Sequence, residues 1–218
     1  MVIVLGLTGS IGMGKSTAAS ALRRLGVPVH DADATVHGLM GRGGRAVAAV
    51  AAAFPGAVVE GAVDRAALGT AVFGDPAALA RLEGILHPLV RESGEQFLRR
   101  HRRRRTPLVC LDIPLLFETG GDQRCDFVAV VSAPPAIQRQ RVMRRRGMSG
   151  ERFAAVLAAQ LPDREKRRRA DFVVQTGLGK HESLRRLAAI VRLLRDPDAR
   201  ARRRKGRRPS DQGLKDQR

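Results

Sequence analysis

The sequence contains very few aromatic side chains: of 218 residues, seven are Phe, and Trp and Tyr are absent. Apolar residues nevertheless make up 44% of the chain, which is ordinary for a globular protein and too much for a disordered one. A chain of this length is expected to form one domain with a substantial core. That core must be aliphatic, built from Ala, Val and Leu.

Cysteine and long apolar runs are also scarce. The two cysteines, Cys110 and Cys125, are too few for a disulfide scaffold or a four-cysteine zinc site. Cys110 lies in an apolar run, which favours a buried small residue over a nucleophile. No apolar stretch approaches the roughly 18 residues that a membrane span needs, and the N-terminus does not have the basic region of a signal peptide. The sequence therefore predicts a cytoplasmic protein without a membrane segment.

Acidic residues are outnumbered, and the positive excess is uneven. The net charge is +19, yet the first 98 residues hold eight basic and eight acidic side chains. The excess lies in residues 139–169, in residues 195–218 and in the run Arg99–Arg105. Nucleic-acid binding, phosphate-ligand binding and a solvated surface from an arginine-rich genome are three explanations. The chain has 35 Arg and only five Lys, a ratio that suggests codon bias and weakens the nucleic-acid explanation. The absence of Tyr and Trp removes the best residues for stacking on single-stranded bases.

Short apolar runs alternate with helical patterns along the chain. This alternation predicts an α/β fold with a parallel sheet covered by helices on both faces. The predicted strands are Val2–Leu7, Val27–His30, Leu108–Ile113, Phe127–Val131 and Phe172–Val174. The predicted helical regions are Ser16–Leu25, residues 34–105 with breaks at Gly41–Gly44, Pro55-Gly56, Asp75-Pro76 and His87-Pro88, residues 136–169 with breaks at Gly147–Gly150 and Pro162, and Ser183–Leu194.

Residues 9–16, Gly-Ser-Ile-Gly-Met-Gly-Lys-Ser, match the Walker A pattern G-x-x-x-x-G-K-[ST]. A predicted strand precedes the motif and a predicted helix follows it, as a phosphate-binding loop requires. Glycines let the backbone wrap around phosphates, and the N-terminus of the following helix favours anions. Lys15 would neutralise charge on the β- and γ-phosphates, and the Ser16 hydroxyl would ligate Mg²⁺. The motif predicts a nucleoside triphosphate site without fixing the reaction.

Acidic residues follow two of the predicted strands. Asp31 and Asp33 come at the end of the second strand, which faces the ligand crevice in a doubly wound sheet. Asp33 is a candidate general base for an attacking hydroxyl. The alternative is that Asp31 or Asp33 caps the following helix, and the sequence favours neither capping nor catalysis. Asp112 ends an apolar strand in the manner of a Walker B motif and is a candidate for holding Mg²⁺ through water.

The basic segment after the fourth strand has the composition of a lid. Arg141 and Arg145 are four residues apart, which predicts that they share one helix face. Arginines that converge on a γ-phosphate stabilise charge in the transition state. The alternative is that these arginines lie on a solvent-exposed face of a helix, and most basic residues of this segment must do so. The apolar turn Pro114–Glu118 likewise either lines a substrate pocket or packs in the core.

Taken in order, these motifs resemble those of the dephospho-coenzyme A kinase family over about residues 1–194. The phosphate-binding loop is generic. The specific part is Asp-Ala-Asp about 16 residues after the loop lysine, with His-Pro and Pro-Leu-Leu-x-Glu downstream. The matching segments are Gly6–Thr17, Val29–Asp33, Leu86–Arg91, Pro114–Glu118, Gln138–Arg141, Ala158–Gln160 and Ala170–Val174.

The resemblance implies an ATP-dependent kinase that phosphorylates the 3′-hydroxyl of the ribose of dephospho-CoA, giving CoA and ADP, with Mg²⁺ accompanying ATP. It implies a P-loop NTPase fold of the nucleoside-monophosphate-kinase type within residues 1–195. The implied parts are a core of about residues 1–33, 106–135 and 170–195, a helical CoA-binding insert of about residues 34–105, and a lid of about residues 136–169. We identify no counterpart of residues 196–218 in the family. Their composition predicts a disordered basic tail that is free to bind polyanions weakly.

The resemblance also implies roles for individual residues. Asp33 is implied as the general base, with Lys15 and Arg141 on the transferred phosphate. The implied ATP contacts are Gly9, Gly12, Met13, Gly14, Lys15, Ser16, Thr17 and Arg145, with Ser16 as the metal ligand. The implied substrate contacts are Thr8, Asp31, Asp33, His87, Pro88, Arg91, Leu115 and Glu118, and Gln160 and Lys166 fall in or beside the lid. One departure lies on the adenine side, where Gln175-Thr176-Gly177 replaces an Asn that many relatives have before the final Gly.

Two other functions stay open on the sequence. The first is another small-metabolite or nucleoside-monophosphate kinase, because a Walker A loop and an arginine lid are common to the superfamily. The second is a nucleic-acid-binding NTPase, which the net charge of +19 suggests, although no recognisable nucleic-acid module is present. Activity measured on a panel of hydroxyl and monophosphate acceptors would distinguish the first alternative from a dephospho-CoA kinase. Salt-dependent polymer binding with polymer-stimulated ATPase activity identifies the second.

Overall fold

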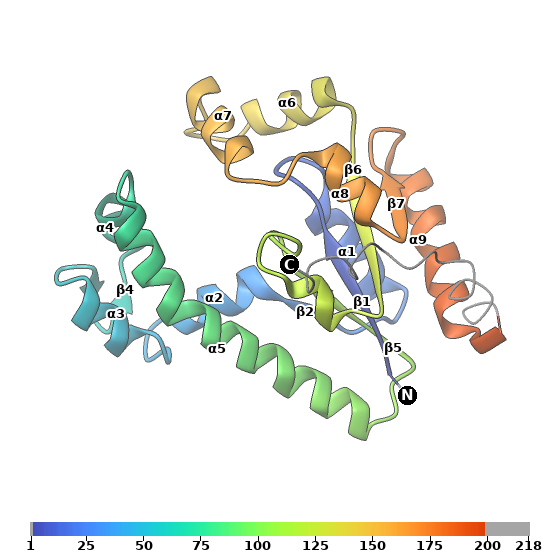
Figure 1. The fold of residues 1–218 in the computed structure, drawn as a ribbon, viewed down its shortest axis with the longest axis horizontal. Helices are drawn as coiled ribbons and strands as arrows, with labels where there is room; N and C mark the ends of the chain where they lie inside the picture. Colours follow the sequence, from blue (N-terminus) through green and yellow to red (C-terminus); the bar gives the residue numbers. More distant parts are fainter. Residues whose placement is uncertain (1, 199–218) are drawn as a thin grey trace, which may run out of the picture.

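The computed structural model describes residues 2–198, and its centre is a five-stranded parallel sheet (Figure 1). The strand order is β2-β5-β1-β6-β7, and every neighbouring pair is parallel. All five strands coincide with predicted ones to within two residues, because each is an aliphatic run bounded by turn residues. The prediction of a disordered tail lies, from residue 199 onward, outside the described residues. The strands are β1 (Ile3–Thr8), β2 (Val29–Asp31), β5 (Leu108–Asp112), β6 (Phe127–Ser132) and β7 (Phe172–Gln175).

Helices cover both faces of the sheet. α1 (Lys15–Arg24) and α9 (Lys180–Arg195) pack on one face in an aliphatic core that contains the fully buried Leu22. The C-terminal half of α5 (Pro76–Arg103) packs on the other face through Leu98, and the turn after β5 covers the rest of it. The α/β fold class predicted from the sequence is confirmed.

A helical insert separates β2 from β5 and extends away from the sheet (Figure 1). It has its own apolar core, in which Val50 and Leu82 are buried. One part differs from the predicted helical character, because β3 and β4 form a small antiparallel hairpin. Glu60 and Gly61 both have positive φ, as a two-residue hairpin turn requires. Besides α5, the elements of the insert are α2 (Ala32–Met40), α3 (Val47–Ala53), β3 (Val58–Val59), β4 (Ala62–Val63) and α4 (Arg65–Val72).

Helix α5 corrects one predicted boundary. A break was expected at His87-Pro88, but α5 continues through Pro88 for 28 residues in all. Proline removes one helical hydrogen bond, yet apolar packing on both sides keeps the helix continuous. Leu82 packs inside the insert and Leu98 packs against the sheet. The break predicted at Asp75-Pro76 is confirmed, because the Asp75 carboxylate caps the N-terminus of α5.

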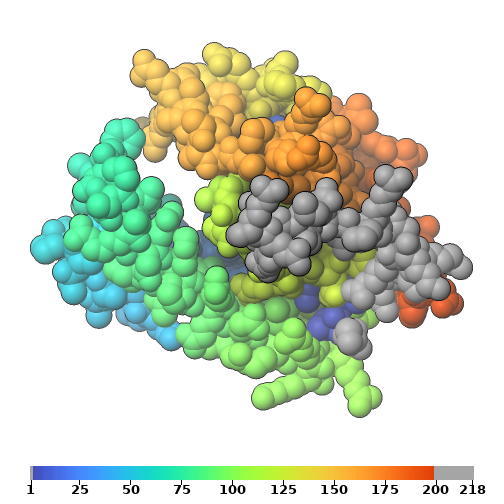
Figure 2. Space-filling model, in the orientation of Figure 1, coloured from blue at the N-terminus to red at the C-terminus, as the bar shows by residue number. Residues whose placement is uncertain are grey.

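Three short helices connect β6 to β7: α6 (Pro135–Met143), α7 (Gly150–Ala158) and α8 (Asp163–Arg169). Because α6 ends at Met143, Arg145 lies in the following turn and not on a helix face shared with Arg141, which corrects that prediction. Figure 2 shows a hollow between this α6–α8 segment and the insert. A single turn of 3₁₀ helix, η1 (Gly121–Arg124), precedes β6. None of the helices within residues 2–198 has the length and apolar character that a bilayer crossing needs.

Candidate active site

The loop between β1 and α1 carries the Walker A sequence at the carboxyl end of the central strand. Gly12 and Gly14 have φ values of 77° and 89°, in the left-handed region that favours glycine. Gly14 is the N-cap of α1 and offers no side chain to the first helical turn, so the N–H groups there are available to an anion. A Cβ on Gly9 would lie 2.4 Å from a methyl group of Val131, so the loop packs against β6 without a side chain at this position.

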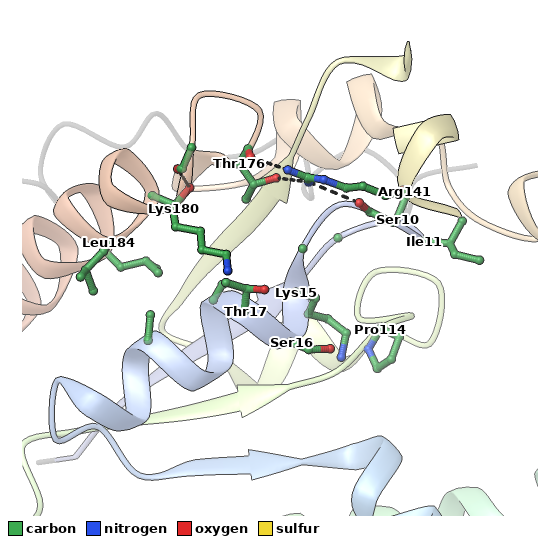
Figure 3. Close-up of a pocket in the computed structure, with 18 of the residues that line it drawn as sticks. Ser10, Ile11, Lys15, Ser16, Thr17, Pro114, Arg141, Thr176, Lys180 and Leu184 are labelled. Carbon is green, nitrogen blue, oxygen red and sulfur yellow. Dashed lines mark hydrogen bonds between the residues drawn. The ribbon is translucent and has the colours of Figure 1, made fainter. Parts of the chain in front are cut away.

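A cavity of about 680 Å³ opens in front of this loop (Figure 3). Lys15, Ser16 and Pro114 lie at one end of it, and Lys180 and Leu184 lie at the other. The structure therefore brings most of the implied ATP contacts, and one of the two motif aspartates, into a single cavity. The implied residues that line it are Gly9, Gly12, Gly14, Lys15, Ser16, Thr17, Asp33, Arg141, Arg145 and Gln160.

Lys15 lies between a carboxylate at the end of β5 and one in the first turn of α2. Its ammonium nitrogen is 2.9 Å from Oδ1 of Asp112 and 3.6 Å from Oδ2 of Asp33. The register of the sheet explains this grouping, because Asp112 pairs with Leu7 on one side and with Asp31 on the other. Burial raises the pKa of Asp112 to about 6; the positive charge of Lys15 opposes this rise, and the charges of Asp31 and Asp33 add to it.

The two aspartates of the Asp-Ala-Asp motif have different environments. Asp31 is the N-cap of α2: its Oδ1 accepts the N–H of Ala34 at 3.0 Å, and its Oδ2 lies 3.5 Å from Arg23. Asp33 lies in the first turn of α2, lines the cavity, and has a side chain that is 69% exposed. Capping therefore belongs to Asp31, whereas the carboxylate of Asp33 is open to a ligand.

Ser16 and Asp112 are the side chains of the P-loop and of β5 that could supply oxygen atoms to Mg²⁺. Oδ2 of Asp112 is buried and accepts no hydrogen bond from the protein, which suits a carboxylate oxygen that bonds to a metal-bound water. Within residues 2–198 no three His, Cys, Asp or Glu side chains are grouped as metal ligands. The donor set fits Mg²⁺, which keeps several waters and takes further oxygens from substrate phosphates.

Arg141 reaches over the P-loop to the segment after β7 (Figure 3). Its guanidinium donates to the carbonyl oxygen of Thr176 at 2.7 Å and to Oγ1 of the same residue at 3.0 Å. The Thr176 hydroxyl in turn donates to the carbonyl oxygen of Met13 at 2.7 Å. Thr176, within the tripeptide that departs from the family pattern, therefore joins α6 to the P-loop. The Met13 side chain is buried, so only its backbone can face a nucleotide.

Sequence reasoning missed the far end of the cavity, where the start of α9 contributes Lys180, His181 and Leu184. Figure 3 shows the Lys180 side chain pointing toward Thr17 at the start of α1. Gly179, with a φ of 102°, precedes this helix. Strand β7, the glycine turn at Gly179 and helix α9, which begins at Lys180, follow the same order as β1, the P-loop and α1. This order was the signal available in the sequence.

The remaining implied substrate contacts do not line this cavity. Thr8 is fully buried, and its hydroxyl donates to the carbonyl oxygen of Pro114 at 2.8 Å. Leu115 is half-buried in the same turn. The carboxylate of Glu118 lies 2.8 Å from the ammonium nitrogen of Lys166. The other three are exposed on the surface of α5 in the insert: His87, Pro88 and Arg91.

The chain is similar to known proteins over nearly all of its described length. Residues 3–181 match the family model described as Dephospho-CoA kinase. A protein named dephospho-CoA kinase from Paramagnetospirillum magneticum is 69% identical over 192 residues, which are 88% of this chain and 91% of that protein. One of the same name from Mesorhizobium japonicum is 57% identical over 193 residues, 88% of this chain and 97% of its own. A crystal structure of a Thermus thermophilus protein is 42% identical, covers 87% of this chain and 96% of its own, and superposes with a TM-score of 0.75.

Proposed function

The chain belongs to the dephospho-CoA kinase family, and from this premise we propose that it phosphorylates the 3′-hydroxyl of the ribose of dephospho-CoA, with Asp33 as general base and Lys15 and Arg141 on the transferred phosphate. The products are CoA and ADP. The observation that carries this function is the family match over residues 3–181. The cavity that joins the P-loop to Asp33 supports the assignment of the individual residues.

The P-loop side of the cavity binds ATP. The free N–H groups at the start of α1 hold the phosphate oxygens, and Lys15 neutralises their charge. Arg141 and Arg145 line the same cavity and add positive charge where the γ-phosphate is transferred. Ser16 and, through water, Asp112 would hold the Mg²⁺ that accompanies ATP, and this ion would neutralise charge on the β- and γ-phosphates.

The acceptor side supplies the base. Asp33 accepts the proton of the ribose 3′-hydroxyl while the oxygen of that hydroxyl forms a bond to the γ-phosphorus. The bond between the γ-phosphorus and the bridging oxygen breaks, and ADP leaves with the electron pair. The exposed carboxylate of Asp33, 3.6 Å from the Lys15 ammonium, supports this role. Asp31 caps α2 and so fixes the position of Asp33 two residues further on.

The insert is the unit that we assign to the CoA part of the acceptor, and the α6–α8 segment is the unit that we assign to the lid. The hollow between the two units in Figure 2 supports this division. His87, Pro88 and Arg91 are exposed on α5 and remain the proposed contacts in the insert. Leu115 is half-buried in the turn after β5 and is a contact nearer the P-loop.

A coupled assay tests the function. The purified chain should convert ATP and dephospho-CoA to ADP and CoA in the presence of Mg²⁺, and the absence of product would overturn the assignment. A panel of hydroxyl and monophosphate acceptors should give much lower kcat/KM values. A better acceptor in that panel would favour another small-metabolite kinase, and ATPase activity stimulated by RNA or DNA would favour a nucleic-acid-binding NTPase.

Two finer assignments complete the proposal. We place the enzyme in the cytoplasm, because that compartment supplies ATP. We assign weak polyanion binding to residues 196–218, because residues 195–218 carry a net charge of +6. Deletion of residues 199–218 should leave kcat and both KM values unchanged and should reduce retention on immobilised RNA. Unchanged retention would assign any such binding to the described part of the chain, where Arg99–Arg105 is the first candidate.

A further inference from the structure

The carboxylate of Glu118 is bonded to the segment that joins α7 to α8. Its Oε1 lies 2.8 Å from Nζ of Lys166 and accepts the N–H of Leu161 at 2.8 Å. The Lys166 side chain is 0% exposed and the Glu118 side chain is 17% exposed. Burial alone would raise the pKa of Glu118, but the close contact with the Lys166 ammonium group and the hydrogen bond from Leu161 outweigh it and hold the pKa below its usual value. Glu118 is therefore a charged group with protein partners at neutral pH.

The residue that precedes Leu161 contacts the P-loop. Oε1 of Gln160 accepts the N–H of Ile11 at 3.1 Å. Gln138 of α6 donates to the carbonyl oxygen of the same residue at 2.8 Å. Ile11 is the third residue of the Walker A sequence, so both of its backbone polar groups are bonded to side chains of the α6–α8 segment.

The turn that carries Glu118 is fixed at both ends. At its start, the Thr8 hydroxyl donates to the carbonyl oxygen of Pro114 at 2.8 Å, which attaches the turn to the end of β1. At its end, Glu118 holds the link between α7 and α8. From that link Gln160 returns to Ile11, three residues after Thr8. These contacts form a closed ring that joins the P-loop, the turn after β5 and the α7–α8 link.

We propose that Glu118 is a positioning residue of the kinase reaction that contacts neither substrate: with Lys166 it fixes the Gln160-Leu161 link, and through that link it fixes the P-loop. This inference rests on the proposed function, and it replaces the role of substrate contact that the family resemblance implies for Glu118. Its consequence is specific. Loss of Glu118 weakens the ATP side of the cavity, although Glu118 lies in the turn on the acceptor side.

The ion pair makes the two partners interdependent. Removal of one member of a buried pair leaves the other charge uncompensated, whereas removal of both is better tolerated. Glu118→Gln, which leaves the fully buried Lys166 without a counter-charge, should therefore disturb the link more than the double variant Glu118→Gln/Lys166→Met does. Glu118→Gln keeps the length of the side chain and an oxygen that can accept the N–H of Leu161, so it isolates the loss of the negative charge that faces Lys166.

Steady-state kinetics of the full chain with ATP and dephospho-CoA test the proposal. Glu118→Gln and Gln160→Ala should each raise KM for ATP about tenfold, because each removes one polar interaction of the ring that holds the P-loop. KM for dephospho-CoA should stay within about twofold. The combined variant Glu118→Gln/Gln160→Ala should be no worse than the poorer single variant, because both act through one link. Arg168→Met is the matched control: it removes a cation from α8 whose side chain is 77% exposed, and it should change neither KM.

Two further measurements need no turnover. Titration with ATP alone should show the same loss of affinity in Glu118→Gln, and hydrogen exchange at the Ile11 amide should become faster in that variant. A rise in KM for dephospho-CoA in Glu118→Gln, with ATP binding and exchange unchanged, would establish direct substrate contact and overturn the proposal. Wild-type kinetics in Glu118→Gln would overturn it as well. Failure of the wild-type chain to phosphorylate dephospho-CoA would instead overturn the proposed function, and the titration and exchange measurements would still decide the role of Glu118.

Discussion

The ammonium nitrogen of Lys15 lies 2.9 Å from Oδ1 of Asp112, a carboxylate that is 1% exposed. The ammonium group of the P-loop lysine is therefore held by the carboxylate of Asp112, which ends the neighbouring strand β5. A bound triphosphate would add negative charge close to the same ammonium group. Asp112 thus fixes the position of Lys15 before ATP arrives, and its own protonation state becomes part of the site.

The raised pKa of Asp112 predicts a specific pH dependence of stability. The folded chain binds this proton as pH falls through about 6, whereas the unfolded chain does so near 3.8. Between these values the folded state holds more protons, so the contribution of Asp112 to stability falls as pH rises. The free energy of unfolding of Asp112→Asn, relative to wild type, should therefore rise by up to about 3 kcal/mol between pH 4 and pH 6.5.

Urea unfolding of both proteins at several pH values measures this difference. Glu83→Gln, at an exposed position of α5, is the control and should follow the wild-type curve. Parallel curves for Asp112→Asn and wild type would show that Asp112 titrates alike in the folded and unfolded states.

Asp33→Asn should reduce kcat by about 10²–10⁴, because it removes the proposed general base and keeps the shape of the side chain. ATP affinity, measured by titration without acceptor, should change little, since the phosphate-binding N–H groups belong to the P-loop. Asp31→Ser is the matched control and should retain most of the activity. A kcat near the wild-type value in Asp33→Asn would place the base elsewhere.

Asp31→Ala should lower the free energy of unfolding by about 1 kcal/mol, because the N–H of Ala34 loses its N-cap acceptor. Asp31→Ser should stay close to wild type, since a serine hydroxyl accepts the same hydrogen bond. Chemical denaturation of the two variants measures the difference. Equal stabilities would mean that the cap contributes nothing and that Asp31 acts through its contact with Arg23.

Gly9→Ala should disturb the P-loop strongly. The new Cβ would lie 2.4 Å from a methyl group of Val131 and 2.7 Å from its carbonyl oxygen. The clash should cost about 1–3 kcal/mol or be relieved by a shift of the loop, and both outcomes weaken ATP binding. The double variant Gly9→Ala/Val131→Ala should recover only part of the loss, because the carbonyl oxygen remains.

Gly69→Ala in α4 is the control for that experiment, because its Cβ would meet no atom within 4 Å. It should raise the free energy of unfolding by about 0.5–1 kcal/mol and leave ATP binding unchanged. Unfolding curves and ATP titrations of both alanine variants make the comparison. Normal ATP affinity in Gly9→Ala would show that the loop accommodates a methyl group there.

The sheet and the P-loop were predictable because their signals are local. Each strand is a short aliphatic run, and the Walker A sequence combines residue types whose spacing has a direct physical cause. The errors arose where packing overrides local preference. Pro88 interrupts the hydrogen bonding of α5, but contacts with two apolar cores keep the helix intact. The hairpin at Glu60-Gly61 is so short that its signal was lost among helical neighbours.

The sequence predicted which residues form the candidate site, but it did not predict how their side chains are arranged. Asp31 and Asp33 both follow the same strand, and only the position of the Ala34 amide separates the cap from the open carboxylate. The contact between Glu118 and Lys166 joins residues that share no motif or spacing. Such pairs depend on how the turn after β5 packs against α8, and sequence periodicity does not contain that information.

Helix α5 has a mechanical consequence for the enzyme. It is 28 residues long, or about 42 Å at 1.5 Å per residue. Its N-terminal half belongs to the core of the insert and its C-terminal half belongs to the core under the sheet. One continuous helix therefore connects the insert to the sheet, and it has no break at His87-Pro88 about which the insert could rotate. The length of this helix therefore sets the distance between the sheet and the far end of the insert.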